Sequence, residues 1–358
     1  MRFAKGHGTE NDFVILPDPD GSVDLTSGLV ARLCDRRAGL GADGVLRAVR
    51  VSGDAAGPGG DGQWFMDYRN ADGSVAEMCG NGIRVFGRYL LDHDLVAGPE
   101  FTVATRGGTR LVRAEPDGEI TVDMGAPQVL GTGRAILAGQ PLEGLRVSLG
   151  NPHLACLVDS PLAEFDLSQP PALDAGQFPD GVNLELVSVI GNGHILMRVY
   201  ERGSGATRSC GTGAVAAAAA AAVAASAGAG AAAGSADGAM AAGDGASGAL
   251  PDVGAPAVLA AAAARPAAAT VPPPAGAAAP PASAVPPPEG AVVLPASAAA
   301  PPQGTVAPPA GGWVVDVPGG RLRVIFDGQT SFLSGPAVIV AEGELDQAWL
   351  SGRPAIPD

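Results

Sequence analysis

Two short motifs with the pattern Cys-Gly-x-Gly contain the residue types needed to move a proton. They occupy Cys79–Gly82 and Cys210–Gly213, and each precedes a run typical of a helix. The first N–H groups of a helix have no intrahelical partner and carry partial positive charge, so they bind anions such as carboxylates. The glycines let a ligand approach the backbone closely. The same field is expected to lower the pKa of each cysteine.

The duplication of this motif indicates one shared site. If both helix N-termini faced the same carboxylate, the two sulfurs would flank the adjacent carbon atom. One thiolate could then remove the α-proton from one face while the opposite thiol delivers a proton to the other face. The charge that develops would lie on the carboxylate, where fixed amides stabilise it. A lone cysteine is more often a small buried apolar residue, but two copies predict acid–base catalysis by Cys79 and Cys210.

The elements that must position these motifs are repeated as well. In each copy a strand-like run ends in a polar pair, and its second member, Asn70 or Glu201, lies nine residues before the cysteine. Strand, loop, Cys-Gly-x-Gly and helix therefore occur twice. This order predicts two related domains that face each other across a cleft.

Short apolar runs bounded by turn residues predict that strands outnumber helices in both halves, which is typical of an α+β fold. Strands are expected at 13–16, 64–68, 101–103, 120–124, 146–149, 154–158, 184–189 and 195–200, and helices at 29–35 and 83–91. A hairpin is expected at 313–326, with its turn at 318–320.

An Ala/Pro/Gly-rich tract at 225–311 interrupts this pattern. It has too few large apolar residues to offset its ordering entropy, so we expect a disordered, partly polyproline-like insertion. A hairpin follows it, which places the insertion inside a domain. The expected domains are therefore 1–116 and 117–345, the second interrupted by 225–311. The tail at 346–358 is expected to return to the N-terminal domain.

Composition narrows the class of protein. The 358 residues carry a formal net charge of -15, which repels phosphate and argues against a nucleic-acid partner. We find neither a secretory signal nor an apolar spanning segment, so a cytoplasmic protein without membrane partners is expected. That compartment keeps thiols reduced. Cys34 and Cys156 lie in apolar runs and are expected in the core, and the histidines show no metal-ligand spacing, so no metal site is expected.

Several stretches together resemble the diaminopimelate epimerase family, in the order that the family has them. They are 8–13, 39–44, 68–74, 78–84, 150–153, 181–183, 201–203 and 209–213, and they leave only the insertion uncovered. The resemblance implies two pseudo-symmetric domains, each a mixed or antiparallel sheet wrapped around a central helix, with the active site in the cleft between them. It implies interconversion of LL- and meso-diaminopimelate in lysine and peptidoglycan precursor biosynthesis. It also implies a homodimer and a reaction without cofactor or metal.

The resemblance assigns roles residue by residue. Cys79 and Cys210 would be the acid/base pair. The substrate would be held by Asn11, Asn70, Gly80, Asn81, Asn151, Asn183, Glu201, Arg202, Gly211 and Thr212. Of these, Arg202 offers a planar fork for a second carboxylate, and Glu201 can accept hydrogen bonds from an ammonium group. His153 would support the site by tuning a thiol or orienting a neighbour.

Two features depart from the family pattern, and two alternative functions stay open. Many members carry glutamine where Gly44 stands, and the helix after Cys210 is nearly pure alanine, which favours helix but offers little side-chain packing. A proline, hydroxyproline or histidine racemase of the same fold would use the same two cysteines. A non-enzymatic scaffold whose Ala/Pro tract binds partners is a further alternative, and the two intact motifs argue against it.

Overall fold

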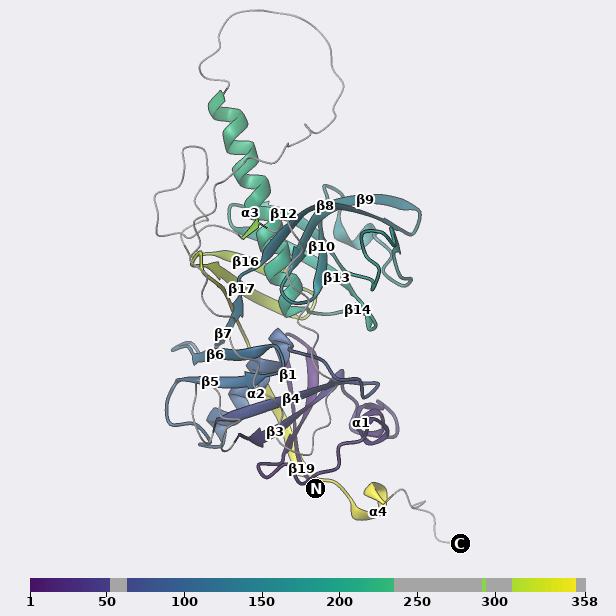
Figure 1. Cartoon of the computed structure of the whole chain (residues 1–358), viewed down its shortest axis with the longest axis vertical. Helices are drawn as coiled ribbons and strands as arrows, with labels where there is room; N and C mark the ends of the chain where they lie inside the picture. The colour runs from purple at the N-terminus through teal and green to yellow at the C-terminus, as the bar shows by residue number, and fades with distance from the viewer. Residues whose placement is uncertain (52–62, 235–291, 294–310, 352–358) are drawn as a thin grey trace, which may run out of the picture.

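The computed structural model describes residues 1–51, 63–234, 292–293 and 311–351. In these ranges the chain forms two lobes, each built of strands around one helix (Figure 1). The helix of the first lobe is α2 (Gly80–Asp92), and that of the second lobe is α3 (Gly211–Gly234). Each of these helices begins at one of the two Cys-Gly-x-Gly motifs.

The first lobe contains eight strands in the spatial order β19, β1, β2, β3, β4, β5, β6, β7. Their bounds are β1 Arg2–Gly8, β2 Asn11–Pro17, β3 Gly44–Arg50, β4 Trp64–Asn70, β5 Glu100–Thr105, β6 Gly108–Ala114, β7 Ile120–Gly125 and β19 Val338–Glu344. Two neighbouring pairs are parallel, β2 with β3 and β4 with β5, and the others are antiparallel.

The second lobe has eight strands in the order β8, β9, β10, β12, β13, β16, β17, β18. Their bounds are β8 Gln128–Leu137, β9 Gln140–Ser148, β10 Pro152–Leu157, β12 Asn183–Gly191, β13 His194–Glu201, β16 Trp313–Val317, β17 Gly320–Phe326 and β18 Ser331–Gly335. Short additions are β11 Ala172–Leu173, β14 Gly205–Thr207, β15 Val292–Val293 and a 3-10 turn at Leu162–Glu164.

The two lobes repeat one topology. In the second lobe the parallel pairs are β10 with β12 and β13 with β16, at the same places in the order as in the first lobe. In both lobes the central helix lies in the chain between the two strands of the second parallel pair. The expected α+β fold of two pseudo-symmetric domains is confirmed, and so are the hairpin at 313–326 and the two helices expected before residue 117.

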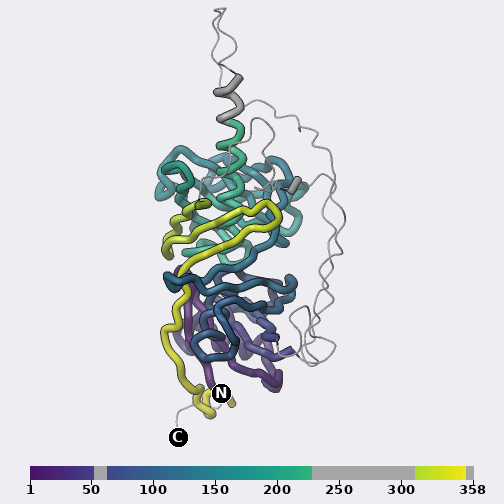
Figure 2. Tube along the Cα trace, turned by 90° about the vertical axis from the view of Figure 1, so that its left-hand side faces the viewer, coloured from purple at the N-terminus to yellow at the C-terminus, as the bar shows by residue number. Residues whose placement is uncertain are grey.

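Two strand pairings connect the C-terminal part of the chain with the first lobe. β7 pairs with β18, which joins the two sheets, and β19 pairs antiparallel with β1. Figure 2 shows this C-terminal segment, in yellow, passing from the second lobe along the side of the first. From Val338 the chain pairs with a strand of the first lobe. β7 pairs with β6 on one side and with β18 on the other.

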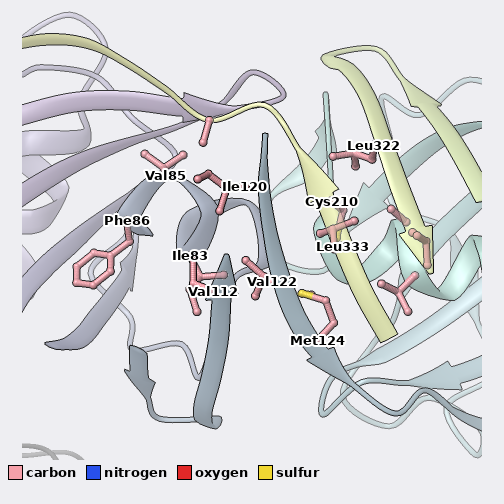
Figure 3. Packing of buried hydrophobic residues seen from close by; sticks show 14 of the residues in the cluster. Ile83, Val85, Phe86, Val112, Ile120, Val122, Met124, Cys210, Leu322 and Leu333 are labelled. Atoms are coloured by element: carbon pink, nitrogen blue, oxygen red, sulfur yellow. The ribbon is translucent and has the colours of Figure 1, made fainter. Parts of the chain in front are cut away.

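A shared apolar core holds the lobes together. Figure 3 shows Ile83 and Val122 of the first lobe in the same cluster as Leu322 and Leu333 of the second. The side chain of Met124 reaches toward the second lobe in this view. Because burial of one such side chain contributes about 1.5–3 kcal/mol, this core fixes the lobes against each other.

Alanine gives α3 a close fit inside the second lobe. Ala214–Ala221 are all buried, and α3 contacts β9, β10, β12, β13 and the strands that follow the tract. Small side chains therefore let the strands approach the helix closely, so the expected lack of packing is not observed.

The tract at 225–311 is only partly described. α3 continues to Gly234, ten residues past the start of the tract, and Val292–Val293 pair with β8. The expected disorder of the remaining tract, 235–291 and 294–310, concerns residues outside the described ranges.

Two small helices cover the far side of the first lobe. Thr26 caps α1 (Ser27–Cys34) by accepting from the Leu29 N–H, and Asp346 caps α4 (Gln347–Leu350). The side chain of Trp349 donates to the carbonyl of Ala38 at 3.0 Å. Cys34 is buried here and Cys156 in the second lobe, as expected. Across the described residues, no helix is both long and apolar enough to cross a bilayer.

Candidate active site

The two cysteines occupy the same position at the start of their helices. Cys79 is the N-cap of α2, and its Sγ accepts a hydrogen bond from the Gly82 N–H at 3.4 Å. Cys210 precedes α3, and its Sγ accepts from the Gly213 N–H at 3.3 Å. Each sulfur therefore replaces the side-chain oxygen that usually caps a helix.

The first glycine of each motif allows the two helix N-termini to meet. A Cβ atom on Gly211 would lie 2.9 Å from the Cα of Gly80 and 3.1 Å from the backbone nitrogen of Asn81. A Cβ atom on Gly80 would lie 3.2 Å from the Cα of Gly211. The 2.9 Å distance to backbone leaves no room for a side chain at Gly211, and the 3.2 Å distance at Gly80 is tighter than most Cβ contacts. The free N–H groups of both helices thereby gather at the junction of the lobes.

An amide on the Cys79 side is held in one orientation. Asn11 places its Oδ1 3.7 Å from the Cys79 Sγ and 3.2 Å from the Nδ2 of Asn81. Its own Nδ2 donates to Asp43 at 2.7 Å, and Arg36 binds the same carboxylate at 2.8 Å. Asp43 therefore fixes which end of the Asn11 amide faces the sulfur.

A buried histidine–glutamate contact supports the Cys210 side. The ring of His153 lies 2.6 Å from Glu185 through Nδ1 and 3.1 Å from the Oδ1 of Asn151 through Nε2. Asn151 donates in turn to Thr212 Oγ1, which lies 3.5 Å from the Cys210 Sγ. The side chains of His153 and Glu185 are fully buried. This chain of contacts connects the pair to the second sulfur.

Three further predicted residues gather at the end of β13. The Arg202 N–H donates to Asn183 Oδ1 at 2.9 Å, and the Arg202 side chain donates to the carbonyl of Asp180 at 3.2 Å. Glu201 accepts a hydrogen bond from Thr207.

Asn70 stands apart from this group. Its side chain donates to Ser74 in its own turn at 3.0 Å, and its backbone pairs with Gly44. The structure thus brings Asn11 and Asn81 to Cys79, and Asn151 and Thr212 to Cys210.

Both thiols are protonated at neutral pH in this environment. Burial raises the pKa of the Cys79 thiol to about 11, although the hydrogen bond from Gly82 opposes that shift. Burial raises the pKa of Cys210 well above its usual 9.0, and the negative charges of Glu201 and Glu185 raise it further. The expected lowering of both pKa values was wrong, because removal of water outweighs the field of the helix N-terminus.

A hydrogen-bond network ties the lobes together beside the sulfurs. Asn81 Nδ2 donates to both the carbonyl and the hydroxyl of Ser209, at 3.1 and 3.2 Å. The Ser209 hydroxyl lies 2.6 Å from that of Thr9, to which Arg84 donates at 3.2 Å. Arg84 is fully buried, and burial lowers its pKa to about 10.

The residues that sequence reasoning overlooked had visible signals. Glu185 is a single carboxylate in an apolar strand, and Arg84 is a cation between the apolar residues Ile83 and Val85 of α2. Charged residues are almost never fully buried without a partner, so a lone charge in an apolar run can indicate a site. Asp43 orients Asn11 by accepting a hydrogen bond from its side-chain amide. Within the described ranges, no group of three or more potential metal-ligating side chains was found.

Comparisons with known proteins place the chain in a family. A sequence model described as diaminopimelate epimerase matches residues 3–130 and 145–243. A diaminopimelate epimerase of Acidothermus cellulolyticus is 41% identical, over 97% of this chain and 97% of its own length. The chain belongs to the diaminopimelate epimerase family. It is therefore an epimerase, an enzyme of the isomerase class.

Other relatives agree with this membership. The diaminopimelate epimerase of Thermobifida fusca is 62% identical over 60% of this chain and 81% of its own length. That of Mycolicibacterium smegmatis is 40% identical over 98% of both chains.

Solved structures with low identity support the fold alone. A hydroxyproline epimerase from Agrobacterium vitis, crystallised with trans-4-hydroxy-L-proline, has a TM-score of 0.55 and 11% identity, covering 96% of this chain and 91% of its own. A phenazine biosynthesis protein of the PhzF family from Bacillus anthracis has a TM-score of 0.52 and 14% identity, covering 96% and 98%.

Proposed function

We propose that this epimerase interconverts LL- and meso-diaminopimelate by moving the α-proton between Cys79 and Cys210. The meeting of two cysteine-capped helix N-termini at one junction carries this proposal. The substrate follows from family membership and from the relatives that bear this name. The reaction would serve lysine and peptidoglycan precursor biosynthesis.

The two helix N-termini would bind the carboxylate next to the reacting carbon. The N–H groups that do so belong to Gly80, Asn81, Gly211 and Thr212. They are fixed before the substrate arrives, so they need no reorganisation as negative charge develops on that carboxylate. Four donors from two helices would also hold the α-carbon between the sulfurs, in the interdomain cleft.

Proton transfer would require one thiolate and one thiol. The thiolate removes the α-proton, the electron pair of the C–H bond moves into the carboxylate, and the opposite thiol then protonates the other face of the carbon. The first sulfur ends as a thiol and the second as a thiolate, so the two exchange roles. Burial raises the pKa of both thiols, and the negative charges of Glu201 and Glu185 add to the rise at Cys210.

The remaining predicted residues would bind the other groups of the substrate. Arg202 offers two parallel donors to the distal carboxylate, and Glu201 can accept from an ammonium group. The amides of Asn11, Asn70, Asn151 and Asn183 would complete these contacts. His153 would support the site through Asn151, to which it is hydrogen-bonded. No cofactor or metal takes part in this proposal.

We further propose a domain division that follows the strand pairing. β1 to β7 together with β19 would form the N-terminal domain, and β8 to β18 the C-terminal domain. Partners are limited in this proposal to the amino-acid substrate and a second copy of the chain, without nucleic acid or membrane. The proposed compartment is the cytoplasm, where the thiols stay reduced.

Incubation of the reduced protein with LL-diaminopimelate in deuterated water tests the reaction. We expect loss of the α-proton signal and formation of the meso isomer by the wild type, and loss of epimerisation in Cys79→Ala and Cys210→Ala. The Cys34→Ala variant is a control, since that cysteine packs in a different apolar cluster from Cys79 and Cys210. Exchange with proline or histidine instead would replace the substrate and keep the mechanism. No exchange with any amino acid would rule the proposal out.

A further inference from the structure

A buried tyrosine on β4 faces the same side of the sheet as Asn70. Tyr68 lies two residues before Asn70, and side chains two apart on a strand share a face. Its side chain is 9% exposed, and its ring meets Phe13 edge-on at 6.0 Å. No role follows for this residue from the two cysteine motifs.

Gly44 leaves the space that the Tyr68 ring fills. A Cβ atom on Gly44 would lie 2.8 Å from the Cε2 atom of Tyr68 and 2.6 Å from the carbonyl oxygen of Arg69. Since Cβ atoms do not make contacts this short, no other residue fits at position 44 while Tyr68 keeps its place. Glycine at position 44, where many family members have glutamine, is therefore linked to the position of the Tyr68 ring.

The hydroxyl of Tyr68 is available to a ligand. Among the described residues, no group forms a hydrogen bond with this hydroxyl. The hydroxyl oxygen is also not one of the fully buried atoms that lack a partner. Phe13, which the Tyr68 ring meets, would lie 3.5 Å from a Cβ atom on Gly82, and the Gly82 N–H binds the Cys79 Sγ. Tyr68 also belongs to the same apolar cluster as Cys79 and Cys210. Burial raises the pKa of Tyr68 well above 10.0, so the hydroxyl stays protonated and can donate.

An apolar neighbour alone does not account for tyrosine at this position. A phenylalanine would pack against Phe13 equally well, and buried hydroxyl groups normally find a partner. A neutral hydroxyl donor in the cluster that holds both cysteines can serve an anionic ligand.

We propose that Tyr68 is a substrate-positioning residue, whose hydroxyl donates a hydrogen bond to a carboxylate of the amino-acid substrate between Cys79 and Cys210. This inference rests on the proposed function. It adds a side-chain donor to the backbone donors of the two helices. Gly44 contributes by leaving the ring its place.

The Tyr68→Phe variant tests this role because it removes only the hydroxyl. A hydrogen bond to a charged group implies that kcat/KM falls about tenfold to a hundredfold, with an unchanged melting temperature. Tyr89→Phe is the matched control, since Tyr89 is equally buried in α2 and its ring packs on His93. Its kcat/KM should stay at the wild-type value.

Binding provides a second readout that packing would not change. In a Cys79→Ser background, which blocks turnover, calorimetry would give the Kd of meso-diaminopimelate with and without Tyr68→Phe. We expect about tenfold weaker binding without the hydroxyl. If Tyr68→Phe leaves kcat/KM and Kd unchanged in an active enzyme, the proposed role of Tyr68 is wrong, even if the melting temperature falls. The proposed function would not be affected by that result. A wild type that neither binds nor exchanges any amino acid would instead overturn the proposed function.

Discussion

The environments of Cys79 and Cys210 differ although the two lobes share one topology. The first parallel pair of each lobe gives a residue-by-residue correspondence between the lobes. Phe13 pairs with Gly44 in the first lobe, and His153 pairs with Asn183 in the second, so Phe13 corresponds to His153 and Gly44 to Asn183. By the same offset, Leu46 of β3 corresponds to Glu185 of β12. The first lobe thus has an apolar pair where the second lobe has a buried histidine–glutamate pair.

The contacts of the second glycine in each motif confirm this correspondence. A Cβ atom on Gly82 would lie 3.2 Å from Leu46 Cδ2, and one on Gly213 would lie 2.8 Å from Glu185 Oε1. Each of these residues therefore lies directly behind the cap of its helix. Identical backbones place a hydrocarbon behind Cys79 and a carboxyl group behind Cys210, which makes the two thiols chemically unequal.

The largest effect should come from separating the helix N-termini. In Gly211→Ala the new Cβ atom would meet the backbone of Gly80 and Asn81, whereas in Gly80→Ala it would first meet the flexible end of Met124 at 2.7 Å. We expect kcat to fall by about a hundredfold or more in Gly211→Ala and less in Gly80→Ala, because misplacement of about 1 Å can have this effect.

Steady-state kinetics of both variants would show the order. Gly28→Ala in α1 is the control, since its Cβ atom would meet nothing within 4 Å. Equal activity of Gly211→Ala and Gly28→Ala would show that the helices need not touch.

The pair behind Cys210, His153–Glu185, should affect the free energy of unfolding differently from its apolar counterpart, Phe13–Leu46. Glu185→Gln replaces the buried carboxyl group that contacts His153 and should lower the free energy of unfolding by about 1–3 kcal/mol at low pH, and by less at higher pH. Leu46→Ala should lower it by about 2–5 kcal/mol through a cavity. Denaturant unfolding measures both values.

Only the Glu185 contribution should depend on pH. Burial raises the pKa of Glu185 above its ordinary 4.5, so the folded protein binds this proton more tightly than the unfolded chain. This contribution is complete below pH 4.5 and decreases as pH rises through the folded pKa. Unfolding of the wild type and Glu185→Gln across this range would show it, and parallel curves would contradict it.

Alkylation should distinguish the two sulfurs. A thiol with a pKa near 11 is only about 0.1% ionised at pH 8, so iodoacetamide should label Cys79 slowly and ever faster as pH increases toward 10. Cys210 should react more slowly still, because it is buried whereas Cys79 is partly exposed. Peptide mass spectrometry would read both rates, and buried Cys156, whose pKa is about 12, should stay unlabelled as a reference. Faster labelling of Cys210 would contradict this order.

A smaller effect is expected from the carboxylate behind Asn11. Asp43→Asn weakens the contact that orients the Asn11 amide and should lower kcat/KM by about threefold to tenfold, with little change in melting temperature. Asp117→Asn is the matched control, because Asp117 accepts a hydrogen bond from the Glu119 N–H within its own exposed turn. If the two variants behave alike, Asp43 has no positioning role.

The local elements followed from the sequence because their signals are local. The cysteine motifs before α2 and α3, the apolar runs of the strands and the hairpin after the tract could all be recognised from neighbouring residues. The pairing of β19 with β1 could not, since 336 residues separate Val338 from Arg2 and no short-range pattern records which distant strand fills an edge. The extent of α3 was also missed, because alanine and glycine beyond residue 224 give no periodic signal.

The sequence by itself determined the chemistry: two cysteines, each followed by the glycines that free the start of a helix, and the amides and charges repeated around them. Only the tertiary structure decided how these groups act on one another. Burial at the junction reversed the expected direction of both thiol pKa values, and placed Glu185 behind one cap and Leu46 behind the other. The physical reason is that residue types are local, whereas desolvation and electrostatic neighbours depend on which segments the fold brings together.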